Sequence, residues 1–392
     1  MNQEKKEVTI LMPCLNESGT IKVCIERAKK LLKEHNIDGE IIISDNGSTD
    51  GSQTIAEKAG ARVLDCPIKG YGAALQYGIE QAKGKFILMG DSDDSYHFDE
   101  AFPMIEMLRN KFDLCMGSRL KGDIKPGAMP LLNRYVGTPF ITFMGKLLFK
   151  TEQSDFNCGL RAFKKDKILQ LNLVTAGMEY ASEMIIKAKL SGLKVSELPI
   201  NFYKDGRGRA PHMQRWRDGW RHLRFLLLHA PGYLFMLPGA LLFFTGLIIL
   251  LLLLRGSFKI RGVEFDVHTM LTAAFMVIIG VQTFFMGIYA KLYVYTRGIL
   301  PYSKRIIAIL AKLSLEKLLV AAIILAILGM AGFLSAFWTW YKVDFKALDY
   351  AVTMRTIIPS LTLIAMAILF VFNGFMLSLL FLKTKYAGIM FE

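Results

Sequence analysis

The chain has 392 residues, 53% of them hydrophobic, and a formal net charge of +14 at pH 7. This length accommodates two or three structural units. The apolar residues are concentrated in long uncharged runs beyond about His229, so contact with an anionic membrane surface explains the positive charge better than nucleic acid does.

Strands and helices alternate along the first part of the chain. Five apolar runs predict strands at Val8–Met12, Glu40–Ser44, Arg62–Asp65, Lys85–Met89 and Phe112–Gly117. The segments between them predict helices, so we expect an α/β domain with a doubly wound, mostly parallel sheet. Polar loops follow three of the strands and should gather at one edge of the sheet. These loops are Pro13–Glu17, Asp45–Asp50 and Asp91–Asp94.

Three carboxylates follow the fourth predicted strand. Asp91, Asp93 and Asp94 come directly after Gly90. Like charges so close together repel unless a cation neutralises them, and their hard oxygen atoms suit Mg²⁺ or Mn²⁺ holding a diphosphate. The alternative is a solvated acidic turn, in which one Asp caps the helix that begins near Asp99. We interpret Asp91 and Asp93 as metal ligands.

Two segments predict helices at the membrane surface. Pro130–Lys150 is strongly apolar but contains three basic residues, so it is either an interfacial helix or a buried helix of the soluble core. Lys204–Arg224 has seven basic residues with two tryptophans between them, which suits a helix on the cytoplasmic membrane surface.

Four later runs are long enough to cross a bilayer, which requires about 20 apolar residues. They are Tyr233–Leu254, Thr269–Ala290, Leu318–Tyr341 and Thr356–Leu382. We therefore expect an all-α transmembrane domain of four helices and an integral membrane protein.

The basic residues predict the orientation of these spans. Residues 204–224 and 291–317 contain seven and six Lys or Arg, whereas residues 255–266 and 342–355 contain three each, balanced by two acids. The excess of positive charge on cytoplasmic segments places both termini and the second loop in the cytoplasm. Residues 1–7 are polar and charged, so we expect no signal peptide.

All five cysteines lie in the predicted cytoplasmic part, and no two have metal-ligand spacing. We expect reduced core thiols at Cys14, Cys24, Cys66, Cys115 and Cys158.

Eight motifs carry a resemblance to a known family. PCLNE (13–17), SDNGSTDG (44–51), KGYGAAL (69–75) and GDSDD (90–94) resemble, in order and spacing, the GT-A glycosyltransferases of family 2. GSR (117–119), DFNCGLRAF (155–163), GMEYASEM (177–184) and RDGWRHLRFLL (217–227) make the chain similar to the dolichyl-phosphate mannose or glucose synthase branch. The likeness covers roughly residues 7–228, and the spans resemble membrane domains appended to bacterial members.

The resemblance implies three regions: a GT-A catalytic domain (1–203), a juxtamembrane basic and aromatic segment (204–230) and the transmembrane domain (231–392). It also implies a donor site for a nucleotide sugar, in which Glu17 and Asp45 hold the base and ribose. Asn46 departs from the acidic pair that is common in the family. The donor residues implied are Pro13, Asn16, Glu17, Asp45, Lys69, Asp91 and Ser92. Two simpler interpretations stay open: the Asp45–Asp50 loop as a helix-capping turn, and Lys69 as a solvated surface residue.

The resemblance further implies an acceptor site for a polyprenyl phosphate. Arg119 and Arg134 would hold its phosphate and, with Asp93 and Asp155, form the catalytic set. Asp155 would orient the acceptor or the metal. Whether Arg161, Glu179 and Glu183 are functional or structural stays open.

The favoured function is transfer of one hexose, from UDP-glucose first and GDP-mannose second, to a polyprenyl phosphate at the cytoplasmic leaflet. One rival is a processive polysaccharide synthase. The segment Gln214-Arg215-Trp216 does not have the spacing of the Q-x-x-R-W motif of such synthases, which disfavours this function. Another is a lipid-linked sugar translocator without catalysis, which intact Asp91, Asp93 and Arg119 disfavour. Self-association into a homo-oligomer is left open.

Overall fold

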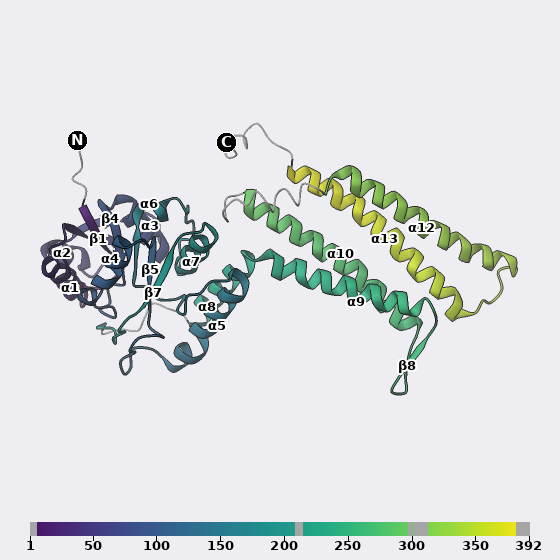
Figure 1. Cartoon of the computed structure of the whole chain (residues 1–392), viewed down its shortest axis with the longest axis horizontal. Coiled ribbons are helices and arrows are strands. Elements are labelled where there is room, and N and C mark those ends of the chain that lie inside the picture. The colour runs from purple at the N-terminus through teal and green to yellow at the C-terminus, as the bar shows by residue number, and fades with distance from the viewer. Residues whose placement is uncertain (1–5, 208–214, 297–299, 301–312, 382–392) are drawn as a thin grey trace. The chain divides into compact units, whose positions relative to one another are not determined.

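The computed structural model describes residues 6–207, 215–296, 300 and 313–381 (Figure 1). The chain divides into two compact units, the first running to Leu228 and the second beginning at His229. Parts of two segments used above to predict topology, residues 208–214 and most of the second loop, lie outside the described residues.

The first unit is built on a sheet with the strand order β3-β2-β1-β4-β6-β5-β7. Neighbouring strands pair in parallel except at β6, which is antiparallel to both β4 and β5. The strands are β1 (Lys6–Cys14), β2 (Gly39–Asp45), β3 (Arg62–Asp65), β4 (Gly84–Met89), β5 (Leu114–Ser118), β6 (Arg161–Lys164) and β7 (Val195–Pro199). The predicted α/β fold with a mostly parallel sheet is confirmed.

Helices cover both faces of this sheet. Alternate residues of β1 point to opposite faces, as in any strand. Val8, Ile10 and Met12 join the core formed with α1, α2 and α4, whereas Leu11 contacts Gly78 of α3. The helical elements are α1 (Ile21–Glu34), α2 (Ser52–Lys58), α3 (Tyr71–Gln81), η1 (Phe98–Glu100), α4 (Phe102–Arg109), η2 (Asn133–Gly137), α5 (Thr138–Phe149), α6 (Lys165–Leu169), α7 (Tyr180–Leu190) and α8 (Arg215–Leu228). The five cysteines are buried and free, as expected.

The antiparallel strand β6 brings a distant loop to the edge where the parallel strands end. Arg161, its first residue, pairs with Met89 near the end of β4 and with Met116 in β5. The loop that precedes Arg161 therefore lies beside the loops that follow β4 and β5. Neither β6 nor β7 was predicted as a strand.

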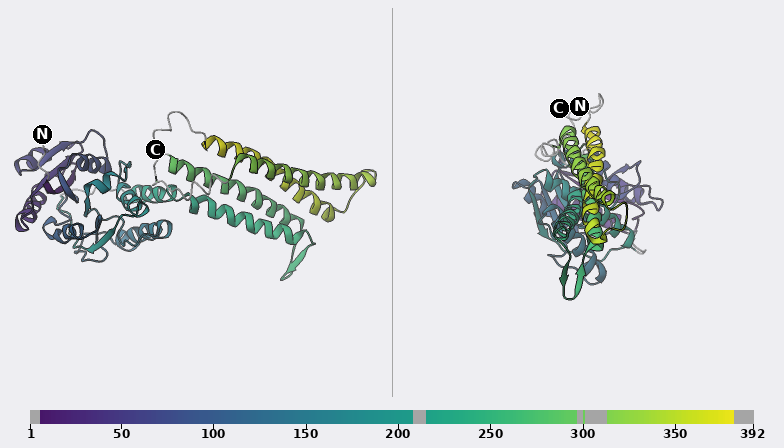
Figure 2. Two further views of the ribbon diagram at one scale, coloured as in Figure 1. Left: turned by 45° about the horizontal axis from the view of Figure 1, so that its top comes forward. Right: turned by 90° about the vertical axis from the view of Figure 1, so that its right-hand side faces the viewer.

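The second unit contains four helices that are long and apolar enough to cross a membrane, at Gly232–Leu253, Val267–Thr296, Leu315–Lys342 and Tyr350–Phe381. They agree with the four predicted spans, although Leu382 lies outside the described residues. Its elements are η3 (Gly232–Met236), α9 (Leu237–Leu253), β8 (Phe258–Ile260), β9 (Val263–Phe265), α10 (Val267–Thr296), α12 (Leu315–Lys342) and α13 (Tyr350–Phe381). Within this unit, α9 lies along α10 and α12 along α13 (Figure 2).

Small residues and one polar group join these helices. Gly239 and Gly280 let α9 and α10 approach so closely that a Cβ on either would meet backbone of the partner helix at 2.6 and 2.5 Å. This use of glycine is typical of helix packing in membranes. Between α10 and α13, the buried Asn373 amide donates to Gln282 Oε1 at 3.0 Å, and the Tyr289 hydroxyl donates to Asn373. Gln282 and Tyr289 both lie on α10, so Asn373 links the two helices.

Candidate active site

The loop after β2 is organised by the carboxylate of Asp45. The backbone N–H groups of Gly47 and Ser48 each donate to its Oδ2 at 2.9 Å, and Gln53 on α2 donates to the same atom at 2.7 Å. Asp45 is 1% exposed. The backbone donors precede α2, so Asp45 stabilises the turn rather than capping the helix, and contact between Asp45 and a nucleotide base stays a prediction.

The other expected donor residues surround this loop. Asn16, which has a positive φ of 59°, accepts from the backbone of Thr49 at 2.7 Å. Lys69 donates to the backbone carbonyl of Asn46 at 2.7 Å, so its ammonium lies at this loop. The Ser92 hydroxyl donates to the carbonyl of Pro13 at 2.7 Å and thereby ties the loop after β4 to the end of β1.

The Asp91 carboxylate lies between α3 and the loop that precedes β6, in close contact with both. The Tyr71 hydroxyl donates to Asp91 Oδ1 at 2.9 Å. Gly159 lies against the other oxygen, because a Cβ at this position would be 2.8 Å from Asp91 Oδ2. Burial, followed by repulsion from Asp93, raises the pKa of Asp91 to about 6, although the Tyr71 hydrogen bond opposes the shift.

Asp93 is paired with an arginine that sequence analysis did not assign to the site. The Arg207 guanidinium donates to Asp93 Oδ2 at 2.7 Å and lies 3.3 Å from Glu17 Oε1. Glu17, Asp93 and Arg207 thus bring together three parts of the chain that are remote in sequence. Arg207 was counted within a membrane-surface segment on the basis of its basic neighbours.

The two aspartates fit a hard divalent cation. Asp91 and Asp93 are close enough for one charge to shift the pKa of the other, and both offer oxygen ligands. Within the described residues, no group of three or more His, Cys, Asp or Glu side chains is placed to hold a metal ion. A cation between Asp91 and Asp93 would therefore take further ligands from a bound diphosphate.

The third carboxylate of this loop is directed elsewhere. Asp94, whose φ is +62°, accepts from Arg27 on α1 at 2.8 Å. Ser95 in the next position donates to Asp93 through its backbone at 3.0 Å. The left-handed backbone at Asp94 thus separates its carboxylate from that of Asp93.

Arg119 and Asp155 form a buried, bidentate ion pair. Arg119 Nε and Nη2 lie 2.7 and 2.9 Å from the two oxygens of Asp155, and the side chains are 10% and 0% exposed. Burial alone raises the pKa of Asp155, but the Arg119 guanidinium outweighs this effect and holds the pKa below its usual value. The Phe202 ring lies 5.1 Å from the guanidinium carbon. The expected catalytic residues Arg119 and Asp155 are thus in direct contact.

Glu197 on β7 supports the Asp155 loop. Its Oε1 accepts from the backbone and hydroxyl of Ser154, at 2.6 and 2.9 Å, and its Oε2 lies 2.6 Å from Lys121 Nζ. Sequence analysis did not identify Glu197, because only the pairing of β7 with β5 brings it to Ser154.

Arg134 lies on η2, half-buried, with its guanidinium carbon 5.5 Å from the Tyr135 ring. Its proposed partnership with Arg119 stays a prediction. Helix α5, which follows η2, packs on the Asp155 loop: a Cβ at Gly145 would meet the Phe156 ring at 2.4 Å.

Two of the residues left open have structural partners. Arg161 is fully buried and donates to three backbone carbonyls, those of Phe156, Cys158 and Ala181. Glu183 is also fully buried, 2.8 Å from Lys187 Nζ, and accepts from the backbone of Thr175. These contacts favour the structural interpretation for both residues.

The raised pKa of Asp91 predicts that the site lowers the stability of the protein. The carboxyl group of Asp91 binds its proton more tightly in the folded state than in an unfolded chain. Ionisation of Asp91 therefore lowers the free energy of unfolding as the pH rises toward about 6, and this loss of stability remains at higher pH. Asp91→Asn should therefore raise the free energy of unfolding by ~1–3 kcal/mol at pH 8 and by less at pH 5. Thermal unfolding in detergent and chelator at both pH values measures this difference. A variant less stable than the parent at pH 8 would contradict the assignment.

Two family models match the chain. Residues 9–171 match glycosyl transferase family 2, and residues 288–381 match the glycosyltransferase family 2 C-terminal transmembrane region.

Individual proteins are also similar. The chain is 36% identical over 350 residues to the low-salt glycan biosynthesis hexosyltransferase Agl6 of Haloferax volcanii, covering 88% of this chain and 83% of the relative. It is 29% identical to the glycosyltransferase AglJ of the same organism, covering 73% and 93%. Among solved structures, glucosyl-3-phosphoglycerate synthase from Mycobacterium tuberculosis, in complex with Mn²⁺ and UDP-glucose, aligns with a TM-score of 0.45 at 18% identity, covering 57% of this chain and 78% of that one.

Proposed function

Because this chain belongs to glycosyltransferase family 2, with four candidate membrane spans after its catalytic domain, we propose that it transfers a single hexose to a polyprenyl phosphate. The donor is a nucleotide sugar, UDP-glucose in the first place and GDP-mannose in the second. The reaction takes place at the cytoplasmic leaflet and inverts the anomeric centre.

The observation that most supports a lipid acceptor is the apolar surface beside the Arg119–Asp155 pair. Helix α5 packs on the Asp155 loop, and large apolar side chains of η2 and α5 are exposed: Tyr135 (67%), Val136 (57%), Phe140 (47%), Phe143 (60%) and Leu147 (48%). Exposed apolar side chains on a helix next to a site for a phosphate suit an acceptor with a long hydrocarbon chain. This exposure also favours the interfacial interpretation of residues 130–150.

On the donor side, negative charge must be balanced before a diphosphate can bind. Asp91 and Asp93 would hold Mg²⁺ or Mn²⁺, which supplies charge neutralisation for the leaving nucleotide diphosphate. Arg207 is the cation already present at Asp93, so we propose that its guanidinium shifts to the donor phosphates when they bind.

The acceptor needs orientation rather than a general base. The second pKa of a phosphate monoester is about 6, so its oxygen is already anionic at pH 7. That oxygen attacks the anomeric carbon while the bond from this carbon to the diphosphate breaks, and the electron pair leaves with the diphosphate. Arg119 and Arg134 bind the acceptor phosphate, and Asp155 holds the Arg119 guanidinium in one orientation.

The direct test uses the full-length protein in detergent with radiolabelled UDP-glucose and undecaprenyl phosphate. We expect label in an organic-extractable product that carries one hexose per lipid. GDP-mannose tested in parallel decides the donor. A water-soluble polymer would support a polysaccharide synthase, and binding of donor without any transfer would support a translocator; either result contradicts the proposal.

The orientation of the spans is tested by a matched pair of substitutions. Ser257→Cys, before β8, should react with a membrane-impermeant thiol reagent added from outside intact cells. Ser303→Cys, in the second loop, should react only after the membrane is opened, because the positive-inside rule places this loop in the cytoplasm. The five native cysteines are buried, which keeps the background low. The reverse pattern of labelling would overturn the topology.

A further inference from the structure

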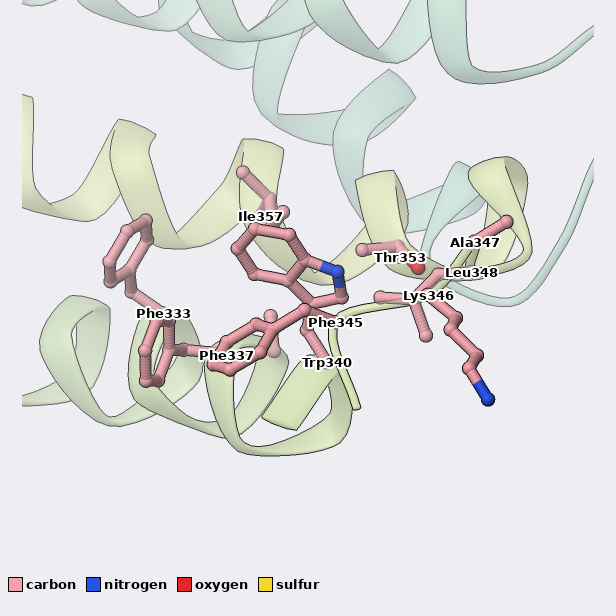
Figure 3. A pocket seen from close by; sticks show the side chains of 10 residues that line it. Phe333, Phe337, Trp340, Phe345, Lys346, Ala347, Leu348, Thr353 and Ile357 are labelled. Atoms are coloured by element: carbon pink, nitrogen blue, oxygen red, sulfur yellow. The ribbon is translucent and has the colours of Figure 1, made fainter. Parts of the chain in front are cut away.

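A cavity of about 520 Å³ lies in the second unit, between the end of α12, the loop that follows it and the start of α13 (Figure 3). Its walls are mainly apolar and aromatic. They include Phe333, Phe337 and Trp340 from α12, Phe345 from the loop and Ile357 from α13. This volume lies within the range of cavities that bind small-molecule ligands.

The aromatic wall is formed by a loop residue in an unusual conformation. Asp344 and Phe345 have φ values of +55° and +59°, in a backbone region that residues other than glycine rarely adopt. This backbone turns the Phe345 ring onto Trp340, with centroids 4.9 Å apart and planes at 87°, and toward Phe337 at 6.2 Å. The three rings remain 41–50% exposed, so they form an apolar surface that nothing within the described chain covers fully.

Several polar groups around the cavity have partners within the protein. The Thr353 hydroxyl donates to the carbonyl of Asp349 at 2.7 Å. The backbone N–H groups of Phe345 and Lys346 donate to the carbonyls of Trp340 and Val343, at 3.1 Å each. A sugar or free phosphate in the cavity would find few hydrogen-bond donors, whereas a hydrocarbon chain needs none.

One charged side chain lines the cavity. The stem of Lys346 lies along its rim, and the ammonium points away from the aromatic rings (Figure 3). Long basic side chains near the ends of membrane helices bury their stem in this way and direct the charge to the lipid headgroups. The cavity thus combines an apolar interior with one cationic side chain at its rim.

We propose that this cavity is a binding site for a membrane lipid with an anionic phosphate headgroup. One hydrocarbon chain lies against Phe337, Trp340 and Phe345, and the phosphate pairs with Lys346. The site is independent of sugar transfer, and its test does not depend on turnover.

The test uses full-length protein in mixed micelles with phosphatidylglycerol that carries a photoreactive diazirine on one acyl chain. Labelling is mapped by peptide mass spectrometry. We expect it to concentrate in residues 333–357. Ala336→Phe, which fills the cavity from α12, should reduce this labelling by about tenfold. Ala331→Phe, the same change at an exposed position of α12 that does not line the cavity, should leave it unchanged.

Ala347→Phe fills the cavity from the exposed loop, where a larger side chain does not disturb helix packing, and it should reduce labelling like Ala336→Phe. Lys346→Gln should remove an approximately fivefold preference for phosphatidylglycerol over phosphatidylcholine. Equal labelling of the parent and both cavity-filling variants would show ordinary lipid contact and overturn the site. A preference that survives Lys346→Gln would overturn the headgroup assignment.

Discussion

Asp93→Asn is expected to reduce sugar transfer by at least about 10²-fold, because a charge at the reacting diphosphate is lost where water is largely excluded. Asp93 is buried and holds Arg207 at 2.7 Å, so the change removes both the proposed metal ligand and the anchor of the Arg207 guanidinium. Transfer is measured with labelled nucleotide sugar and polyprenyl phosphate, and folding is checked by thermal unfolding.

The adjacent residue provides the control. Asp94→Asn makes the same chemical change one position later, but Asp94 pairs with Arg27 on α1 rather than with the site. It should retain most of the activity and lose only the modest stability contribution of a partly exposed ion pair, about 1 kcal/mol. Equal losses in the two variants, near-normal transfer by Asp93→Asn, or full activity of the parent protein in excess chelator would contradict the metal assignment.

The second large effect is expected at the Arg119–Asp155 pair. Arg119→Met or Asp155→Leu alone should destabilise the protein by about 3–5 kcal/mol, because each leaves an uncompensated charge in a site that is 0–10% exposed. The double variant should recover most of this stability, since replacing a whole buried ion pair by apolar side chains is often neutral. Unfolding of the four proteins measures the coupling between the two side chains.

The transfer activity of the double variant then distinguishes a structural role of the Arg119–Asp155 pair from a catalytic one. If Arg119 binds the acceptor phosphate, the double variant folds, binds the nucleotide normally by calorimetry and fails to transfer. Restored transfer in the double variant would show that the pair only stabilises the fold. Loss of nucleotide binding with unchanged affinity for the lipid would instead assign Arg119 to the donor site.

The parts of the fold that are encoded in short stretches were predictable from the sequence. Of the apolar runs now seen as β1 to β4, the first, second and fourth end in polar loops, and the parallel arrangement brings these loops to one edge. The four spans are equally local signals, because a bilayer requires one long apolar run for each.

Contacts between remote segments were not predictable. Arg207 pairs with residues 114 and 190 positions away, and its basic neighbours indicated a membrane surface instead. The short strand β6 escaped detection because four residues show no clear periodicity, although it is what brings Asp155 to the sheet edge where Arg119 lies. The partnership of Asp155 with Arg119 is likewise visible only in three dimensions.

The pairing of Glu17 with Arg207 also has a consequence for biosynthesis. The two residues are 190 positions apart, so nearly the whole first unit must leave the ribosome before its acidic cluster receives this guanidinium. Until then Glu17, Asp91 and Asp93 repel one another without it. Because domains generally fold as units, the first unit can complete its folding only after Arg207 has been synthesised. The first candidate span begins at Gly232, shortly after Arg207, so a nascent chain completes the candidate active site and begins its membrane domain at almost the same stage of translation.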